Sequence, residues 1–262
     1  MKPENIQTIQ QAFTQQSMQF ESSNMNFTNK DYLAYTVSRI TPCTTDHVLE
    51  VAAGTCACGR ALAPLVGTVT CLNMTPAMLE VGRQEARKQN LDNISFVQGC
   101  AEELPFLDHS FDMVLSRLAF HHFAEVTQPF REMVRVLKPG GKLVLIDMEA
   151  AAEDLQITED AIETLRDPSH VRNLSKAEIV GLFTENGLAV TLCESTPIPV
   201  SLTAWMELTK TLEQVQQEIV GRMRTELDGG PQTGFAPYQT KDGIFFRQRW
   251  LLTVGVKSDG EN

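Results

Sequence analysis

The sequence has few positive charges, few aromatic residues and no long apolar run. It carries 22 Lys and Arg against 33 Asp and Glu, which gives a formal net charge of −11. Proteins that bind nucleic-acid backbones need a basic stripe, and no Lys/Arg cluster occurs, so we expect no nucleic-acid partner. No stretch approaches the roughly 18 apolar residues of a membrane span, so we expect no membrane-spanning segment.

Cysteine is also sparse and irregularly spaced in this chain of 262 residues, unlike the cysteines of a small disulfide-bonded secreted domain. The first residues, MKPENIQTIQQAF, lack the apolar core of a signal peptide. We therefore predict a cytoplasmic protein with reduced thiols. The cysteines are Cys43, Cys56, Cys58, Cys71, Cys100 and Cys193.

The most informative segment is VLEVAAGTCACG at residues 48–59. Its apolar start predicts a buried strand, and Gly54 and Gly59 mark places where the backbone turns sharply or approaches a ligand. The following RALAPLV predicts a short helix, whose first N–H groups favour a polar or negative ligand. The glycine spacing partly matches a dinucleotide fingerprint, but a nicotinamide site has no use for Glu50 inside the strand. A ligand with a cationic group does, because a carboxylate binds it by a charge-assisted hydrogen bond.

VLEVAAGT resembles the first motif of class I S-adenosylmethionine-dependent methyltransferases, and the blocks after it strengthen the resemblance. They alternate strand and helix patterns up to REMVRVLKPGGKLVLID, which predicts a parallel sheet with helices on both faces. Residues 45–150 resemble the family of the ubiquinone and menaquinone biosynthesis methyltransferases, known as methyltransferase domain 11. The resemblance implies a Rossmann-like, doubly wound α/β sheet of seven strands with the last strand antiparallel.

The same resemblance implies a site for S-adenosyl-L-methionine. Glu50 would bind the methionyl ammonium, Asn73 stands where the family has an acid for the ribose, and Cys100 stands where the family often has Asp near the adenine. The backbone N–H of Ala101 would meet the adenine ring. The full set of predicted cofactor contacts is Glu50, Ala52, Gly54, Cys56, Asn73, Met74, Cys100, Ala101, Glu102 and Ser116.

Cys56 replaces a glycine of the family motif. A Cβ at a positive φ costs roughly 1–2 kcal/mol and takes space near the cofactor, so we expect weaker binding. Together with Cys71 and Cys100 it offers three thiols, which leaves a soft-metal or redox site as an alternative. We favour small apolar residues in a pocket wall and expect no metal.

The stretch SRLAFHHF follows the fourth predicted strand, at the edge that faces the transferable methyl group in this fold. Adjacent histidines on a helical turn point about 100° apart, so only one of them faces the site. We predict His121 as a general base, because an imidazole titrates near neutral pH. Arg117 is predicted as a second catalytic residue, with an ion pair or the binding of an anionic substrate group as the alternatives. Weaker candidates are Asp147, Glu149, His170 and Arg172.

Four segments are predicted. They are an N-terminal helical cover at residues 1–40, a methyltransferase core at 41–197, a helical cap at 198–243, and the last core strand with the tail at 244–262. The cap separates the last two strands by far more residues than a hairpin needs, which predicts a cover over the carboxyl edge of the sheet. One amphipathic helix is expected from Leu202 to about Leu227. An apolar substrate wall is expected from Trp205, Met206, Leu208 and Phe235.

The sequence therefore predicts an S-adenosylmethionine-dependent methyltransferase that acts on a small molecule. Two other classes of protein remain. The departures at Cys56, Asn73 and Cys100 fall on cofactor contacts, so a degenerate binding or scaffolding module without catalysis is the first. A dehydrogenase is the second, and Glu50 together with the missing acid at the end of the second strand disfavours it. The identity of the substrate and the oligomeric state stay open.

Overall fold

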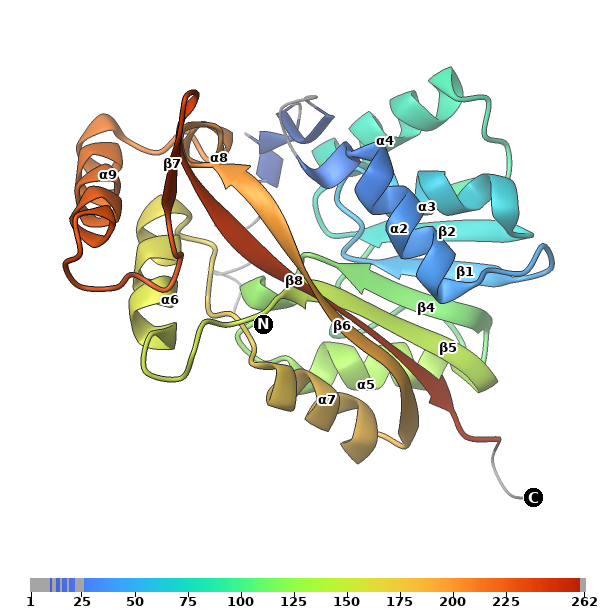
Figure 1. Cartoon of the computed structure of the whole chain (residues 1–262). Coiled ribbons are helices and arrows are strands. Elements are labelled where there is room, and N and C mark those ends of the chain that lie inside the picture. Colours follow the sequence, from blue (N-terminus) through green and yellow to red (C-terminus); the bar gives the residue numbers. More distant parts are fainter. Residues whose placement is uncertain (1–9, 11–12, 15, 18, 22–25, 260–262) are drawn as a thin grey trace.

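The computed structural model describes residues 10, 13–14, 16–17, 19–21 and 26–259 and contains one mixed β-sheet with helices on both faces (Figure 1). The strand order is β3-β2-β1-β4-β5-β8-β6, and β7 pairs with β8. The strands are β1 (His47–Val51), β2 (Thr68–Asn73), β3 (Ile94–Gln98), β4 (Phe111–Arg117), β5 (Leu137–Met148), β6 (Leu188–Ser201), β7 (Tyr238–Thr240) and β8 (Gly243–Lys257).

The strand directions confirm the predicted Rossmann-like topology. β1 to β5 pair in parallel, and β8 lies antiparallel between β5 and β6. The structure adds one strand to the predicted seven, because Tyr238–Thr240 pairs with the first residues of β8 as a short hairpin. β6 continues to Ser201, because its second half pairs with β8 from Trp250 back to Phe245.

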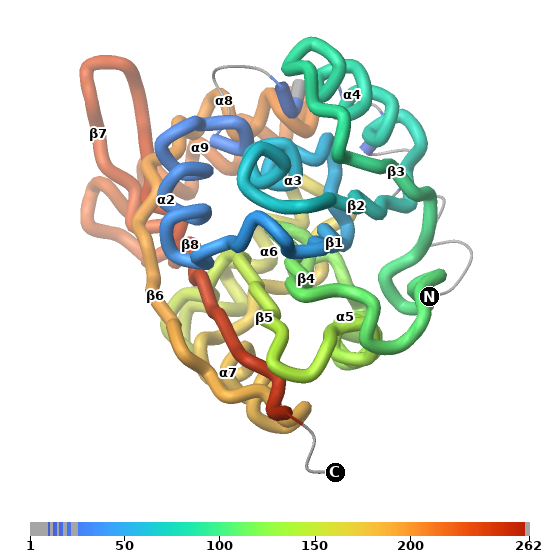
Figure 2. The backbone as a smooth tube through the Cα atoms, turned by 90° about the vertical axis from the view of Figure 1, so that its right-hand side faces the viewer, coloured from blue at the N-terminus to red at the C-terminus, as the bar shows by residue number. Residues whose placement is uncertain are grey.

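Alternating side chains of the strands build two hydrophobic cores, one on each face of the sheet. Leu49 and Val51 face the core that contains Phe130 and Phe183, which belong to helices on one face of the sheet. Val48 faces the core on the opposite face, together with residues of the helices there, such as Cys58 and Leu62. Figure 2 shows α2 (Lys30–Ile40), α3 (Ala57–Leu62) and α4 (Pro76–Lys88) on one side of the sheet and α5 (Thr127–Val136) and α7 (Lys176–Glu185) on the other. Both faces of the central strands are therefore buried, as the near-continuous apolar runs predicted.

The helices between the strands follow the sequence closely. Ser175 caps α7 with a complete capping box in which Glu178 is the reciprocal partner. Thr75 precedes α4, and its side chain makes no capping bond. The helices of the core are α2 (Lys30–Ile40), α3 (Ala57–Leu62), α4 (Pro76–Lys88), α5 (Thr127–Val136), α6 (Gln156–Arg166) and α7 (Lys176–Glu185), and short 3-10 turns are η1 (Gln19–Glu21), η2 (Asn26–Thr28), η3 (Ala63–Leu65) and η4 (Phe120–His122).

The segment predicted as a cap contains two helices, so the prediction of one helix from Leu202 to about Leu227 is wrong. α8 (Leu202–Leu208) and α9 (Glu213–Leu227) are separated by a turn in which Lys210 has a φ of 53°. A residue in the left-handed region ends a helix, and the backbone N–H of Thr211 then bonds back to the carbonyl of Met206.

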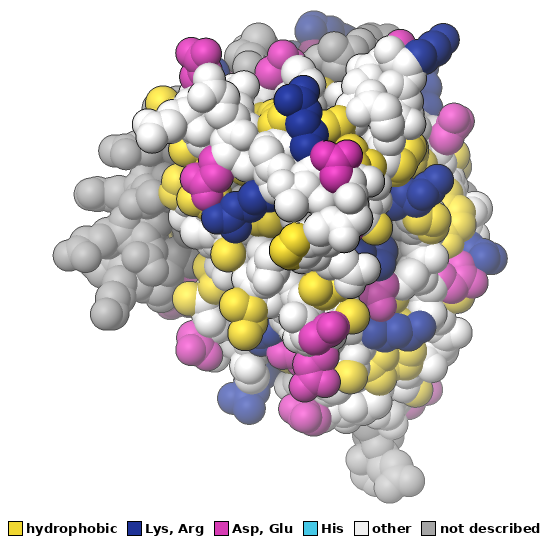
Figure 3. Space-filling model, turned by 60° about the vertical axis from the view of Figure 1, so that its left-hand side comes forward, with side chains coloured by type: hydrophobic (Ala, Val, Ile, Leu, Met, Phe, Trp, Pro, Cys, Tyr) yellow, Lys and Arg dark blue, Asp and Glu magenta, His cyan; other side chains and the backbone are white. Residues whose placement is uncertain are grey.

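The N-terminal cover is seen in part. α2 packs through Ile40 on the hydrophobic core that contains Val48, whereas most of residues 1–18 of the predicted cover lie outside the described residues. On the face drawn in Figure 3, Lys and Arg side chains are interspersed with Asp and Glu. No helix in the described ranges has both the length and the apolar character needed to cross a membrane.

Candidate functional site

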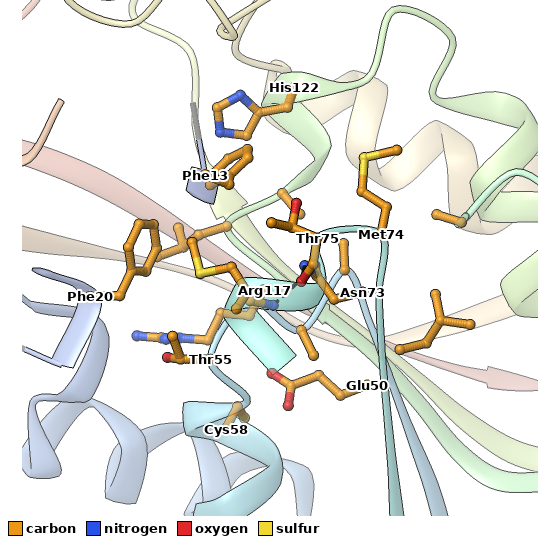
Figure 4. Close-up of a pocket in the computed structure, with 18 of the residues that line it drawn as sticks. Phe13, Phe20, Glu50, Thr55, Cys58, Asn73, Met74, Thr75, Arg117 and His122 are labelled. Atoms are coloured by element: carbon orange, nitrogen blue, oxygen red, sulfur yellow. Dashed lines mark hydrogen bonds between the residues drawn. The ribbon is translucent and has the colours of Figure 1, made fainter. Parts of the chain in front are cut away.

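A cleft opens where β1, β2 and β4 end, and it encloses about 920 Å³ including the solvent at its mouth (Figure 4). Parallel strands of an open α/β sheet bring their carboxyl ends to one edge, where such folds bind ligands. We call it the first cavity. Its walls are formed by Phe13, Phe20, Phe27, Glu50, Ala52, Ala53, Gly54, Thr55, Ala57, Cys58, Leu72, Asn73, Met74, Thr75, Met78, Gly99, Ala101, Glu102, Arg117, Leu118, Ala119, His122 and Phe123.

Glu50 lies inside β1 and is only 3% exposed. Its Oε2 accepts a hydrogen bond of 2.7 Å from the backbone N–H of Gly59 and one of 3.7 Å from the thiol of Cys71. Burial raises the pKa of Glu50 to about 7, although the N–H of Gly59 and the positive charge of Arg117 oppose that rise. The cavity wall thus holds a carboxylate whose ionisation a cationic ligand would favour.

Gly59 is the residue that allows this contact. A Cβ at Gly59 would lie 2.6 Å from Cys71 Sγ and 2.7 Å from Glu50 Oε2, closer than real Cβ contacts. We expect Gly59→Ala to lower the free energy of unfolding by about 1–3 kcal/mol, since overpacking a core forces its neighbours to move. Urea denaturation measures this change. Gly221→Ala is the control because Gly221 lies within α9 with open space around it, and there alanine is expected to stabilise the helix.

Gly54 forms the turn after β1 and has a φ of 56°, in the left-handed region that favours glycine. Nothing lies within 4 Å of the position of a Cβ there, so the turn presents bare backbone to the cavity. Asn73 holds the turn, because its Oδ1 accepts a 3.2 Å bond from Gly54 N and its Nδ2 donates a 3.4 Å bond to Thr75 O. Asn73 therefore orders the ends of β1 and β2 against each other.

Arg117 ends β4 with its guanidinium buried beside the same cavity. Its Nη1 donates a 3.0 Å bond to the carbonyl of Phe27, and its Cζ lies 5.1 Å from the ring centroid of Trp250. Burial lowers the pKa of Arg117, with Cys58 and Glu50 opposing. Nε and Nη2 are buried and have no hydrogen-bond partner among the described residues. A buried guanidinium with unpaired donors is costly unless a ligand supplies the acceptors.

Two residues on either side of Gly54, Ala52 and Cys56, also have positive φ. Ala52 has a φ of 54° and lines the cavity, and Cys56 has a φ of 63°. The side chain of Cys56 is fully buried in the hydrophobic core that contains Val48, and it does not line the cavity. Cys58 lines the cavity instead, and burial raises the pKa of its thiol to about 12. Crowding of the cavity by Cys56 is therefore absent, whereas its backbone strain is present.

The other predicted cofactor contacts divide into two groups. Met74, Ala101 and Glu102 line the first cavity. Cys100 and Ser116 do not, and the hydroxyl of Ser116 is buried without a partner among the described residues. Within the described ranges, no group of three or more His, Cys, Asp or Glu residues is placed to hold a metal ion.

A second cavity of about 630 Å³, solvent at its mouth included, adjoins the first. His122 contributes to both cavities, whereas His121 lines only the second. The residues common to the two cavities are Phe13, Phe20, Phe27, Leu118 and His122. The second cavity is lined besides by Gln16, Asn26, His121, Met148, Arg166, Asp167, Val200, Trp205, Leu208, Gln248 and Trp250.

His121 is paired with Asp147, which lies near the end of β5. Nδ1 of His121 is 2.5 Å from Oδ1 of Asp147, and both side chains are buried. Oδ2 of Asp147 accepts the backbone N–H groups of Ala119 and Phe120, so the carboxylate is fixed. Burial lowers the pKa of His121, but the charge of Asp147 and its hydrogen bond outweigh burial and raise it overall. Asp147 thereby fixes the orientation of the ring and leaves Nε2 for other contacts.

His122 has a different environment on the next residue. Its Nδ1 lies 2.9 Å from the carbonyl of Ser169, and its ring packs edge-on against Phe13 at 5.1 Å. Burial and the neighbouring His121 lower the pKa of His122 to about 3. His122 is therefore a neutral wall of the cleft over the usual pH range.

The weaker candidates have structural partners. Glu149 accepts a bond from Ser195, His170 pairs with Asp160 at 2.9 Å, and Arg172 pairs with Glu178. In the cap, Trp205 and Leu208 line the second cavity. Met206 and Phe235 instead pack in a third hydrophobic core with Phe246.

Several cavity residues had no signal in the sequence. Phe13, Phe20 and Phe27 come from the N-terminal segment and meet the sheet edge only in the folded protein. Cys58 lies two residues after Cys56, the cysteine that the motif comparison singled out. The pairing of Asp147 with His121 joins residues 26 positions apart, and only adjacent strand ends bring them together.

Comparison with known proteins agrees with this architecture. Residues 49–145 match the family described as a methyltransferase domain. The chain is 33% identical over 220 residues to YcgJ, an uncharacterized methyltransferase of Bacillus subtilis (strain 168), covering 82% of this chain and 86% of that one. The crystal structure of YcgJ superposes with a TM-score of 0.79 at 29% identity, covering 88% of this chain and 99% of that chain.

Two further similarities cover a smaller share of the matched protein. A demethylmenaquinone methyltransferase of Listeria welshimeri is 40% identical over 104 residues, which is 38% of this chain and 44% of that protein. A Haemonchus contortus phosphoethanolamine N-methyltransferase 2, solved in complex with S-adenosyl-L-methionine, has a TM-score of 0.62 at 18% identity and covers 94% of this chain and 56% of that one. The second similarity shows the fold alone.

The sheet order, the antiparallel β8 and the cleft at the end of β1 define the class I methyltransferase fold. The match of its domain and the similarity to YcgJ along most of both chains show that the protein belongs to the methyltransferase family.

Proposed function

We propose that this protein transfers a methyl group from S-adenosylmethionine to a small molecule. The observation that carries the proposal is a pair of opposite charges on one cavity. Glu50 holds a buried carboxylate, and Arg117 holds a buried guanidinium with two nitrogens that lack partners among the described residues. An α-amino acid group satisfies both, because its ammonium pairs with the carboxylate and its carboxylate accepts from the guanidinium. A nicotinamide dinucleotide has no such group.

The remaining walls fit the rest of that cofactor. The bare backbone at Gly54 leaves room for close approach, and the hydroxyl of Thr75 is buried beside the cavity without a partner among the described residues. Asn73 retains an acceptor lone pair and one donor proton for the ribose hydroxyls. Ala101 and Glu102 stand where the adenine would lie.

Bound S-adenosylmethionine supplies a sulfonium methyl group, so the protein itself has to align the partners and exclude water. Glu50, Gly54 and Arg117 fix the amino-acid end of the cofactor. Three phenylalanines, Phe13, Phe20 and Phe27, form an apolar wall that excludes water from the junction of the two cavities. His121, fixed by Asp147, accepts a proton from the acceptor substrate at Nε2.

The roles of the two predicted catalytic residues therefore separate. Arg117 binds the anionic end of the cofactor, a role that was not among its alternatives from the sequence, and His121 is the base. The division of the chain stands as part of the proposal, with 198–243 as a cap that supplies Trp205 and Leu208 to the acceptor side.

Isothermal titration calorimetry with three ligands tests the proposal. S-adenosylmethionine and S-adenosylhomocysteine are expected to bind at one site per chain, and NAD is expected not to bind. Binding of NAD alone would favour the dehydrogenase and overturn the proposal. Binding of the two S-adenosyl compounds without methyl transfer to any compound in a broad acceptor screen would favour the binding module.

Arg117 gives a prediction with opposite effects on binding and stability. We expect Arg117→Met to weaken binding of S-adenosylmethionine about 10- to 100-fold, the range for losing hydrogen bonds to a charged group. The free energy of unfolding without ligand is expected to stay equal or to rise, because a buried charge with two unpaired nitrogens is replaced by an apolar chain of similar length. Calorimetry and urea denaturation measure the two quantities.

The control for this prediction is Arg135→Met. Arg135 bonds to Glu132, Asp108 and backbone carbonyls away from both cavities, so this change should lower stability and leave cofactor affinity unaltered. Unchanged affinity in a folded Arg117→Met variant would contradict the proposed role of Arg117.

A further inference from the structure

The second cavity is an aromatic slot beside the first. Trp205 from α8, Trp250 from β8, and Phe13, Phe20 and Phe27 from the N-terminal segment line it, and Leu118, Met148, Val200 and Leu208 complete its apolar walls. Flat aromatic walls favour a planar apolar ligand, because stacked and edge-to-face contacts add to area burial. The phenylalanines and Leu118 border both cavities, so a ligand in the slot reaches the end of the first cavity.

Arg166 and Asp167 are the charged side chains that line the slot, and Glu163 beside Arg166 adds a second carboxylate to this cluster. Arg166 bonds to Glu163 at 3.2 Å, lies 3.8 Å from Asp167 and covers the ring of Trp205 at 4.5 Å. Asp167 also accepts bonds from the backbone N–H and the hydroxyl of Ser169. A preformed anion would meet this excess of carboxylates, so the slot favours an electrically neutral ligand.

One side chain of the slot is placed to accept a proton. His121 lines the slot, its Nδ1 is held by Asp147, and its Nε2 has no hydrogen-bond partner among the described residues. The neighbouring His122 is a poor substitute because its lowered pKa, about 3, disfavours proton uptake. A neutral compound that has to lose a proton as it reacts therefore fits the slot better than one that does not.

We propose that the second cavity binds a neutral, planar aromatic hydroxyl compound and that His121 takes its hydroxyl proton as the oxygen accepts the methyl group. The inference rests on the proposed function and specifies its acceptor. The phenolic oxygen forms a bond to the methyl carbon while the carbon–sulfur bond breaks, and that electron pair leaves with the sulfur. The phenolic proton passes to Nε2 of His121, so atoms and charges balance with S-adenosylhomocysteine and an aryl methyl ether as products.

The first test measures binding to the slot without catalysis. The chain has two tryptophans, Trp205 and Trp250, and both line the slot. 4-Nitrophenol absorbs where tryptophan emits, so at a mildly acidic pH that keeps this phenol uncharged it should quench the fluorescence saturably, and 2-naphthol should compete with it. Decahydro-2-naphthol, the saturated relative, should compete at least 10-fold more weakly. Absence of saturable quenching by a panel of phenols and naphthols would overturn the proposal.

The second test blocks the slot from its far wall. Val200 lines the second cavity and not the first, so Val200→Phe should raise the dissociation constant of 4-nitrophenol at least 10-fold and leave that of S-adenosylmethionine unchanged. Val190→Phe is the control because Val190 lies on the same strand, β6, and lines neither cavity. Equal phenol affinity in wild type and Val200→Phe would place the phenol elsewhere and contradict the proposal.

The third test addresses the proton. Methylation of 2-naphthol, followed by the mass of the ether, should fall at least 100-fold in His121→Asn while S-adenosylmethionine affinity stays unchanged. Methylation of 4-nitrophenol should fall less, because this more acidic phenol ionises with less help from a base. An equal fall for both phenols would overturn the role of His121 as base.

The pH profile separates a base from a structural histidine. The groups around His121 are Asp147, Glu163, Asp167, His122 and His170, and the first of these raises its pKa most directly. Turnover of 2-naphthol should fall as pH drops through this raised pKa, and Asp147→Asn should move that limb to lower pH. If the pH at which turnover falls were the same in Asp147→Asn and wild type, the pairing of His121 with Asp147 would be contradicted. If S-adenosylmethionine fails to bind at all, the proposed function fails, whereas the quenching experiment still decides whether the slot binds phenols.

Discussion

Replacing Gly54 by Val is expected to abolish binding of S-adenosylmethionine while the protein remains folded. Gly54 has a φ of 56°, and the space around the position of its Cβ is open because the cavity lies there. A valine side chain would fill that space and would also strain the left-handed turn by roughly 1–2 kcal/mol. We expect a loss of affinity of at least 100-fold by calorimetry.

Gly187→Val separates the lost space from the strain. Gly187 has a φ of 74°, is exposed after α7 and also has nothing near its Cβ position, but it lies outside both cavities. This control should lose a similar amount of stability and keep its affinity. Equal affinities of Gly54→Val and wild type, with both folded, would contradict the placement of the cofactor.

Replacing Glu50 by Gln is expected to weaken binding of S-adenosylmethionine about 10- to 100-fold at pH 8, the effect of losing a charge-assisted hydrogen bond. Burial raises the pKa of Glu50 to about 7. The wild-type affinity should therefore fall as pH drops below about 7, because protonation removes the charge that pairs with the ammonium. The affinity of Glu50→Gln should lack this dependence, which calorimetry across pH 5.5–8.5 measures.

The same pKa has the opposite consequence for the ligand-free protein. Between the usual value of 4.5 and about 7, the folded protein holds a proton that the unfolded chain releases, so its stability should fall as pH rises. Glu50→Gln should remove that fall. Glu159→Gln is the control because Glu159 is a buried acid with a raised pKa outside both cavities, and its replacement should leave the pH dependence of cofactor affinity intact.

The sequence predicted the part of the site that is local in the chain. Glu50, Gly54 and Asn73 follow from a strand, a turn and the end of the next strand, because parallel strand ends meet at one edge. Periodicity also predicted the alternation of strands and helices in the core. Register and strand count in the second half were harder, because β7 is short and the turn at Lys210 divides a continuous apolar pattern.

What the sequence did not predict depends on contacts between distant segments. The phenylalanines of the N-terminal segment reach the cleft only through tertiary packing. The sequence also did not predict the direction of the Cys56 side chain at the strained turn. Cys56 was expected to crowd the cofactor, yet its left-handed conformation places the thiol in the core, and Cys58 faces the cavity instead. The prediction that only one of the adjacent histidines faces the site is wrong, because both line the second cavity, and their different environments depend on Asp147 and Ser169.

The most direct test of the central claim is a crystal structure of the protein grown with S-adenosylhomocysteine. We expect electron density for the ligand in the first cavity. Its ammonium should lie at Glu50, its carboxylate within hydrogen-bond distance of Arg117 Nε and Nη2, and its ribose beside Asn73. Density for the ligand at another place, or a first cavity without ligand density at saturating concentration, would contradict the proposed cofactor site.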